Sequence, residues 1–174
     1  AGSWLGDVPR DVTTTSDLAY ELYQEGEGYV ERYDLEAAAA AFTAAVEADS
    51  TFAMAHLQLS GLMWQLGRRD EAQEHLTRAA ELTDTVSEIE RLWIERALAR
   101  YSDEPDRVEE ITAEVTERFP DHPWVLRLLG ERARQRGEYA KALQNFERAL
   151  ELDPEAVDIH NKRGYIYLGM GEYE

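Results

Sequence analysis

The fold is decided most clearly by the 34 residues 123–156, which read PWVLRLLGERARQRGEYAKALQNFERALELDPEA. Apolar residues in this stretch recur at the three- and four-residue spacing of a helix in two successive groups, first Leu126, Leu129 and Ala133, then Ala142, Leu143, Phe146, Ala149 and Leu150. Gly137 lies between the groups, where a helix has to end. The stretch therefore predicts two antiparallel helices joined by a short turn.

The same pattern repeats along the chain. A shift of 34 residues relates Ala38, Phe42 and Ala45 to Ala72, Leu76 and Ala79, and it also relates Val108, Thr112 and Val115 to Ala142, Phe146 and Ala149. Between these two pairs of repeats the step is 36, which places a two-residue insertion near residues 82–86. A fixed period of this length is the signature of an array of helical repeats.

Glycine and proline mark where the predicted helices end and begin. Gly67, Gly137 and Gly171 occupy equivalent places after a first helix, where a left-handed residue can end it at little cost. Pro123 and Pro154 suit the first position of a following helix, whose N–H has no intrahelical partner.

Capping residues support two further helix starts. Ser87 and Glu90 have the spacing of a capping box. Asp103 is placed to cap the helix that Pro105 helps to begin.

At these residues the sequence resembles the tetratricopeptide repeat (TPR) family. The closest match is residues 123–156, through the motif residues Leu126, Leu129, Gly130, Gly137, Glu138, Tyr139, Ala142, Phe146, Ala149 and Pro154. The resemblance implies an all-α fold, an α-α superhelix (TPR solenoid) of antiparallel helix pairs.

The repeats divide the chain into an N-terminal extension, residues 1–15, and a repeat array, residues 16–174. The expected units are 19–52, 53–86, 89–122, 123–156 and a partial unit 157–174. Unit 89–122 departs furthest from the motif. Because the last unit ends where its second helix would begin, we expect the natural protein to continue.

A second resemblance concerns residues 86–95, which are similar to a segment of repeat regions attached to bacterial signalling and regulatory proteins. It implies that the array is part of a larger regulatory chain.

Composition limits the classes of partner. The net charge is −18, from 36 acidic and 18 basic residues, which argues against a nucleic-acid partner held through phosphates. The charge is uneven, since residues 1–52 carry 2 basic and 11 acidic side chains while residues 123–174 carry 8 and 9. No apolar run approaches a membrane span of about 20 residues. The chain has no cysteine. We expect a cytoplasmic protein, and the periplasm stays open.

The resemblance implies that partners bind the concave wall formed by the first helix of each unit. Aromatic and arginine side chains, the types that dominate binding hot spots, lie off the core stripe of these helices. The candidate groove residues are Tyr20, Tyr23, Trp64, Trp93, Arg100, Tyr101, Trp124, Arg127, Arg134, Asn161, Lys162 and Tyr165. The alternative for any one aromatic is that it fills a gap between neighbouring helix pairs.

Some family members hold a partner's terminal carboxylate with a clamp of lysine, asparagine and arginine on the first helices. The matching places here hold Tyr23, Glu27, Gln58, Glu90 and Ile94, so the clamp residues are missing. We therefore do not expect binding of that kind.

Residue patterns for catalysis or metal binding are weak. The four histidines are far apart in sequence, and His56 and His160 occupy equivalent, core-facing places. Carboxylate pairs such as Glu109 and Glu110 are typical of a solvated helix face. We expect no enzyme activity, no cofactor and no metal.

Two functions remain. The first is a scaffold that binds a peptide or protein segment in the concave groove. The second is a module for self-assembly, a homo-oligomer formed through the terminal helix or the groove.

Overall fold

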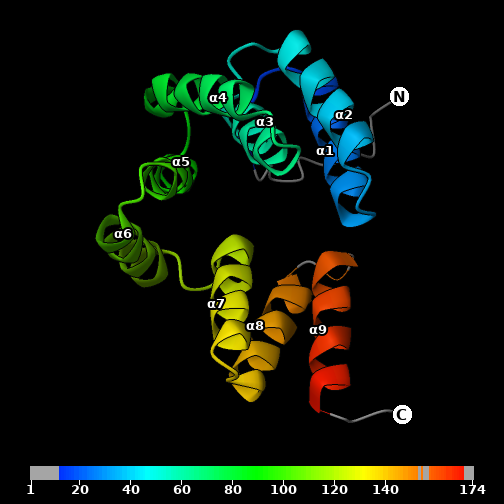
Figure 1. The fold of residues 1–174 in the computed structure, drawn as a ribbon, viewed down its shortest axis with the longest axis vertical. Coiled ribbons are helices and arrows are strands. Elements are labelled where there is room, and N and C mark those ends of the chain that lie inside the picture. The colour runs from blue at the N-terminus through cyan, green and yellow to red at the C-terminus, as the bar shows by residue number, and fades with distance from the viewer. Residues whose placement is uncertain (1–11, 153, 155–156, 171–174) are drawn as a thin grey trace, which may run out of the picture. The chain divides into compact units, whose positions relative to one another are not determined.

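The computed structural model describes residues 12–152, 154 and 157–170. Every regular element in these ranges is helical, which confirms the predicted all-α fold of the TPR solenoid class. The elements are α1 (Asp17–Glu31), α2 (Leu35–Ala48), α3 (Ala53–Gln65), α4 (Arg69–Glu81), the 3-10 helix η1 (Thr83–Thr85), α5 (Glu88–Tyr101), α6 (Pro105–Arg118), α7 (Pro123–Gln135), α8 (Tyr139–Leu152) and α9 (Val157–Met170) (Figure 1). The chain divides into two compact units between Glu109 and Glu110, inside α6. From here on, the first unit and the second unit mean these two parts of the chain, each of which contains more than one of the predicted repeats.

Each turn within a helix pair has three residues, and its middle residue is left-handed. The φ angles are 77° at Gly67 and 75° at Gly137, as predicted, while Gly171 lies outside the described residues. Tyr33 (60°) and Asp103 (56°) adopt the same conformation without being glycine, at a cost of about 1–2 kcal/mol each. Asp103 is thus two residues before α6 and not at the position directly before it, so the predicted cap is not formed.

Helix starts follow the sequence signals at two of three further places. Ser87 and Glu90 form the predicted capping box at the start of α5. Pro123 is the first residue of α7, also as predicted. The prediction for Pro154 was wrong, because α9 begins only at Val157 and Pro154 lies in the turn before it.

In the first unit, α1 and α2 interlock through a glycine and a phenylalanine. A Cβ atom on Gly26 would lie 2.8 Å from Cε1 of Phe42, so only glycine allows this close approach of the two helices. Phe42 and Phe52 are fully buried, and the ring of Tyr23 packs against both at centroid distances of 5.3 and 5.0 Å. In the next pair, α3 and α4, the equivalent places hold Ser60 and Leu76, both buried.

In the second unit, α7 and α8 use the same interlock. A Cβ on Gly130 would lie 2.6 Å from Cδ1 of the buried Phe146 and closer still to Cε1. The helix α9 adds two apolar side chains to this core. The core consists of Leu126, Ala133, Ala142, Phe146, Ala149, Leu150, Ile159 and Ile166.

The segment that precedes α1 is part of the first unit from residue 12 onward. Val12 is buried, and Thr13 donates its backbone N–H to Oε1 of Glu90 (2.7 Å) and its hydroxyl to Oε2 (2.5 Å). Thr14 donates its hydroxyl to Asp49 (2.6 Å). Residues 12–14 therefore tie the start of α5 to the end of α2. The rest of the expected extension lies outside the described residues.

None of the described helices is both long and apolar enough to cross a membrane.

Candidate functional site

The first unit brings together two of the predicted groove residues, Trp64 and Tyr101. Trp64 lies near the end of α3 and Tyr101 ends α5, and their rings meet edge to face with centroids 5.5 Å apart. Trp64 is still 47% exposed and Tyr101 37% exposed. Two aromatic side chains from different repeats thus form one accessible surface.

Two residues of this surface were missed at the sequence level because they lie on a second helix. The guanidinium carbon of Arg69, the first residue of α4, lies 3.3 Å from the centroid of the Trp64 ring. The hydroxyl of Tyr101 donates to Oε1 of Gln73, also on α4, at 3.3 Å. The signal that could have found Arg69 is its place directly after the turn that follows Trp64. We call Trp64, Arg69, Gln73 and Tyr101, the residues that these contacts join, the Trp64 patch.

The other candidates in the first unit differ in exposure. Tyr20 and Trp93 are half-buried, and Arg100 is exposed. Tyr23 is 3% exposed and belongs to the core, which corrects the expectation that it lies off the core stripe. Burial raises the pKa of the Tyr23 hydroxyl well above its usual value. Its ring fills the space between α1, α2 and the residue before α3, because Phe42 and Phe52 leave room for a third ring there.

Three of the clamp positions named above hold side chains that hydrogen-bond to one another. The amide of Gln58 donates to the hydroxyl of Tyr23 (3.2 Å) and to Oε1 of Glu27 (2.9 Å). Glu90 and Ile94 are buried. These places therefore carry no cation that could hold a carboxylate.

In the second unit, Glu131 of α7 joins two of the candidates. Its Oε2 accepts from Arg134 at 3.0 Å, and its Oε1 lies 3.9 Å from Nζ of Lys162 on α9. Arg134 is exposed, whereas Lys162 is half-buried. The carboxylate places two cations from different repeats on one surface, and sequence patterns did not single it out.

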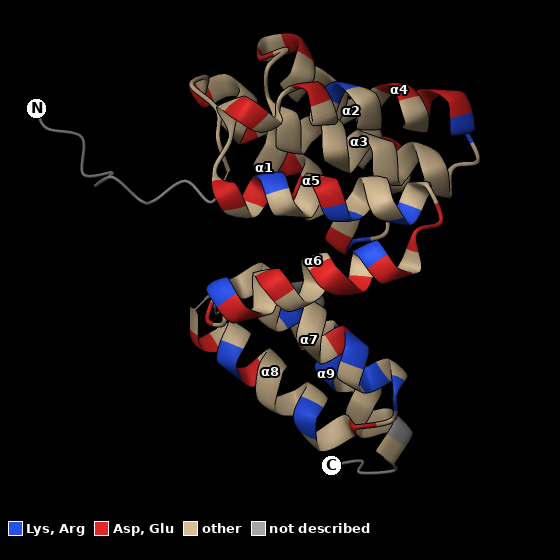
Figure 2. Ribbon diagram, turned by 90° about the vertical axis from the view of Figure 1, so that its left-hand side faces the viewer, with Lys and Arg blue, Asp and Glu red and all other residues tan. Residues whose placement is uncertain are grey.

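The remaining candidates of the second unit lie at various depths. Trp124 is half-buried, and its ring packs against that of His122 with centroids 5.3 Å apart. Arg127 is also half-buried, while Asn161 and Tyr165 are exposed, Tyr165 by 61%. Lysine and arginine residues occur on each of the helices α7, α8 and α9 (Figure 2).

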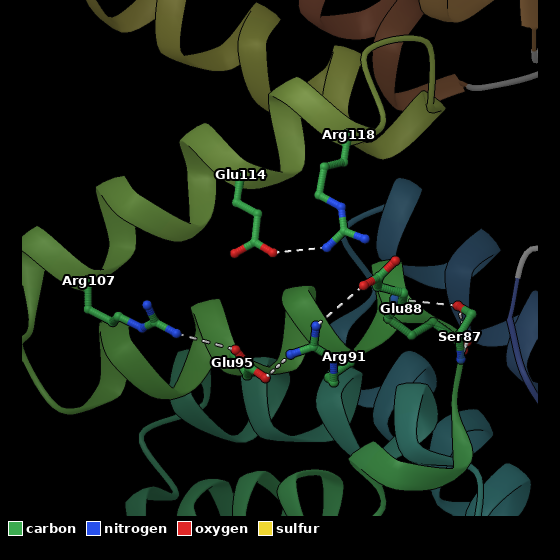
Figure 3. A network of polar contacts seen from close by, with 8 residues as sticks. Ser87, Glu88, Arg91, Glu95, Arg107, Glu114 and Arg118 are labelled. Carbon is green, nitrogen blue, oxygen red and sulfur yellow. Dashed lines mark hydrogen bonds and ion pairs between the residues drawn. The ribbon is translucent and has the colours of Figure 1, made fainter.

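Ion pairs neutralise many arginines elsewhere on the surface. Arg91 of α5 lies between two carboxylates, 2.5 Å from Glu95 and 3.7 Å from Glu88, and Glu95 is also 3.6 Å from Arg107 (Figure 3). Exposed pairs of this kind contribute at most about 1 kcal/mol each to stability. Their effect is to neutralise part of the positive charge on the described surface.

The structure brings two histidines together that are 19 residues apart. The Nδ1 atoms of His56 on α3 and His75 on α4 are 3.1 Å apart, and Nε2 of His56 is 3.4 Å from the carbonyl oxygen of Ser50. Because a carbonyl only accepts, His56 carries its proton on Nε2 and accepts from Nδ1–H of His75. His160 makes the equivalent contact with the carbonyl of Pro154 but is exposed, so the core-facing prediction was wrong for it. No described helix follows α9 to cover it.

The histidine pair predicts a loss of stability at acidic pH. Burial lowers the pKa of both rings, and for His56 the neighbouring His75 lowers it further. The unfolded chain therefore takes up protons below about pH 6.5 that the folded pair resists, so the free energy of unfolding falls with pH from there. The charged groups that act on the rings are Asp49, Arg68, Glu71, Glu74 and Arg78.

His75→Phe should reduce this pH dependence, measured as urea midpoints between about pH 8 and pH 5.5. His160→Ala is the matched control, and its urea midpoint should change with pH as steeply as that of the parent. An unchanged slope in His75→Phe would show that the pair is not the cause.

No catalytic arrangement is apparent among the described side chains. Glu109 and Glu110 are exposed to solvent, and no group of three or more His, Asp or Glu side chains in the described ranges could hold a metal ion.

Comparisons with known proteins agree with this architecture. A model described as "Tetratricopeptide repeat" matches residues 29–92, and one described as "TPR repeat" matches residues 120–171. No curated protein matches the sequence significantly.

Solved structures with similar folds are distant in sequence. YrrB, a TPR protein with an unusual peptide-binding site, is 18% identical with a TM-score of 0.44, over 90% of this chain and 79% of that one. Pseudomonas aeruginosa pilF is 20% identical with a TM-score of 0.49, over 90% of this chain and 71% of that one. The first TPR of Spaghetti (RPAP3), solved with an HSP90 peptide, is 16% identical with a TM-score of 0.41, over 90% of this chain and 95% of that one. The repeated glycine–phenylalanine interlock, the left-handed turns and the two matching repeat models together place this chain in the tetratricopeptide-repeat family.

Proposed function

We propose that this chain is a protein-interaction scaffold that binds a peptide segment along the faces of its first helices. The observation that carries the proposal is the exposure of Trp64, which stays 47% accessible although two neighbouring side chains hold its ring in place. A large, rigid aromatic side chain binds a partner with little loss of conformational entropy. In the second unit, Arg134, Asn161 and Tyr165 offer a further accessible surface. Tetratricopeptide-repeat proteins are in general non-catalytic scaffolds of this kind.

The test is a selection of short random peptides on the immobilised chain, followed by measurement of their Kd by fluorescence polarisation. We expect Trp64→Ala to weaken the selected peptides by at least about tenfold, as hot-spot residues do. Tyr33→Asn is the matched control, because Tyr33 is a 74% exposed aromatic residue of the same unit and asparagine tolerates its left-handed backbone. If no selected peptide depends on Trp64 or on the second-unit residues Arg134 and Tyr165, the proposal fails.

A second candidate function is self-assembly, which the exposed apolar side chains of α9 favour. Tyr165, Leu168 and Met170 are 61%, 52% and 42% exposed along this helix. Tyr165 and Leu168 lie three residues apart and so on one side of α9, where two copies can bury them against each other. Light scattering at high micromolar concentration tests this candidate: Leu168→Glu should shift a dimer to monomer, and a monomeric parent chain rules it out.

A further inference from the structure

We propose that the Trp64 patch binds a peptide segment in which an aspartate or glutamate lies next to an apolar side chain. This inference rests on the proposed function and adds the chemistry of the partner. The patch draws on three helices, with Trp64 on α3, Arg69 and Gln73 on α4, and Tyr101 on α5, where the exposed Arg100 directly precedes it. All of them belong to the first unit.

The aromatic part of the patch is fixed before any partner arrives. The guanidinium carbon of Arg69 lies 3.3 Å from the centroid of the Trp64 ring, and the rings of Trp64 and Tyr101 meet edge to face with centroids 5.5 Å apart. Tyr101 is in turn held by Gln73 through its hydroxyl. A prepared surface of this kind avoids the entropy cost of ordering side chains on binding. Its accessible area is suited to an apolar side chain of the partner.

The charged part of the patch has donors to offer. A guanidinium that stacks on a ring uses its flat face, so its N–H groups point outward in the plane, where they match the two oxygens of a carboxylate. Arg69 and Arg100 form no ion pair with any described residue, whereas the neighbouring Arg68 is held by Glu71. Arg100 occupies the place in α5 that Trp64 occupies in α3, 36 residues earlier.

Charge balance selects the kind of anion. In a chain with twice as many acidic as basic residues, accessible arginines without carboxylate partners are positions where an anionic side chain gains contacts that the chain itself does not supply. Asp70 and Glu71 follow Arg69 directly, and they would repel a polyanion such as nucleic acid or a multiply charged phosphate. A single peptide carboxylate fits this field best. These arginines are not at the clamp positions, which are occupied by Tyr23, Glu27 and Gln58.

The experiment uses peptides selected on the whole chain and replaces each Asp or Glu in them by Asn or Gln. We expect the selected peptides to be rich in acidic residues, and the replacement to weaken binding to the parent about tenfold. On Arg69→Gln the same replacement should matter less than about twofold, because the guanidinium partner is already gone. Arg100→Gln is tested with the same pairs of peptides, and Arg68→Gln is the matched control. Circular dichroism shows that each variant is folded.

The outcomes separate the two proposals. Coupling between a peptide carboxylate and Arg69 or Arg100 supports the inference. If peptides bind in a Trp64-dependent way but show no coupling to either arginine, the acidic partner is wrong while the scaffold function stands. If inorganic phosphate competes more strongly than chloride at equal ionic strength, the patch recognises phosphate and the inference is overturned. If no peptide depends on Trp64, the patch is not a peptide site.

Discussion

Replacing Glu90 by alanine is expected to lower the free energy of unfolding by about 2–4 kcal/mol, measured by urea denaturation. This carboxylate is 1% exposed and accepts four hydrogen bonds, two from Thr13 and two from the backbone N–H (2.9 Å) and hydroxyl (2.6 Å) of Ser87. Its removal leaves the backbone N–H groups of Thr13 and Ser87 without these acceptors in a partly buried environment. It also releases the segment before α1 from the start of α5.

Two variants determine how much of this loss comes from the link to the N-terminal segment. Thr13→Val keeps the backbone N–H and loses only the hydroxyl, so we expect a loss of about 1 kcal/mol. In the variant that carries both Glu90→Ala and Thr13→Val, the two losses in the free energy of unfolding should not add, because both substitutions remove the same contact. Glu88→Ala, an exposed position in the same helical turn, should change stability by less than about 0.5 kcal/mol. A Glu90→Ala variant as stable as Glu88→Ala would contradict this account.

Two glycines inside helices are expected to respond to alanine in opposite directions. Gly130→Ala should destabilise the chain by about 1–3 kcal/mol, because its Cβ would overlap the buried ring of Phe146. Gly61→Ala should stabilise it by about 0.5–1 kcal/mol, because a Cβ there meets nothing within 4 Å and alanine favours the helix. Urea denaturation of both variants measures the difference in sign.

A second substitution tests the reason for the loss at Gly130. In the Phe146→Leu background the smaller side chain leaves more room for the new methyl group, so Gly130→Ala should cost less there than in the parent. If Gly130→Ala is as stable as the parent, or costs the same in both backgrounds, the close contact between α7 and α8 is not what requires glycine.

The repeat architecture could be predicted from the sequence because it depends on local patterns. The 34-residue period, the apolar spacing around Phe146 and the turn glycines Gly67 and Gly137 all act over a few helical turns. The family could therefore be recognised before any contact was known. The prediction for Pro154 was wrong because a proline that suits the start of a helix also suits the turn before it.

The candidate site was only partly predictable. Trp64 and Tyr101 were selected by residue type and helix position, but the same criteria selected Tyr23, which is buried. Helix position leaves the depth of a side chain open, since depth depends on the size of its neighbours across the interface, here Phe42 and Phe52.

The sequence by itself determined the fold class, the turn positions and the residue types on the first helices. Only the tertiary structure decided which distant side chains meet: Arg69 with Trp64, His56 with His75, and Thr13 with Glu90 across 77 residues. The reason is physical. A helical period reports which face of a segment is apolar, whereas contacts between polar or aromatic side chains depend on the distance and rotation at which packed helices settle, and many residues contribute to that geometry at once.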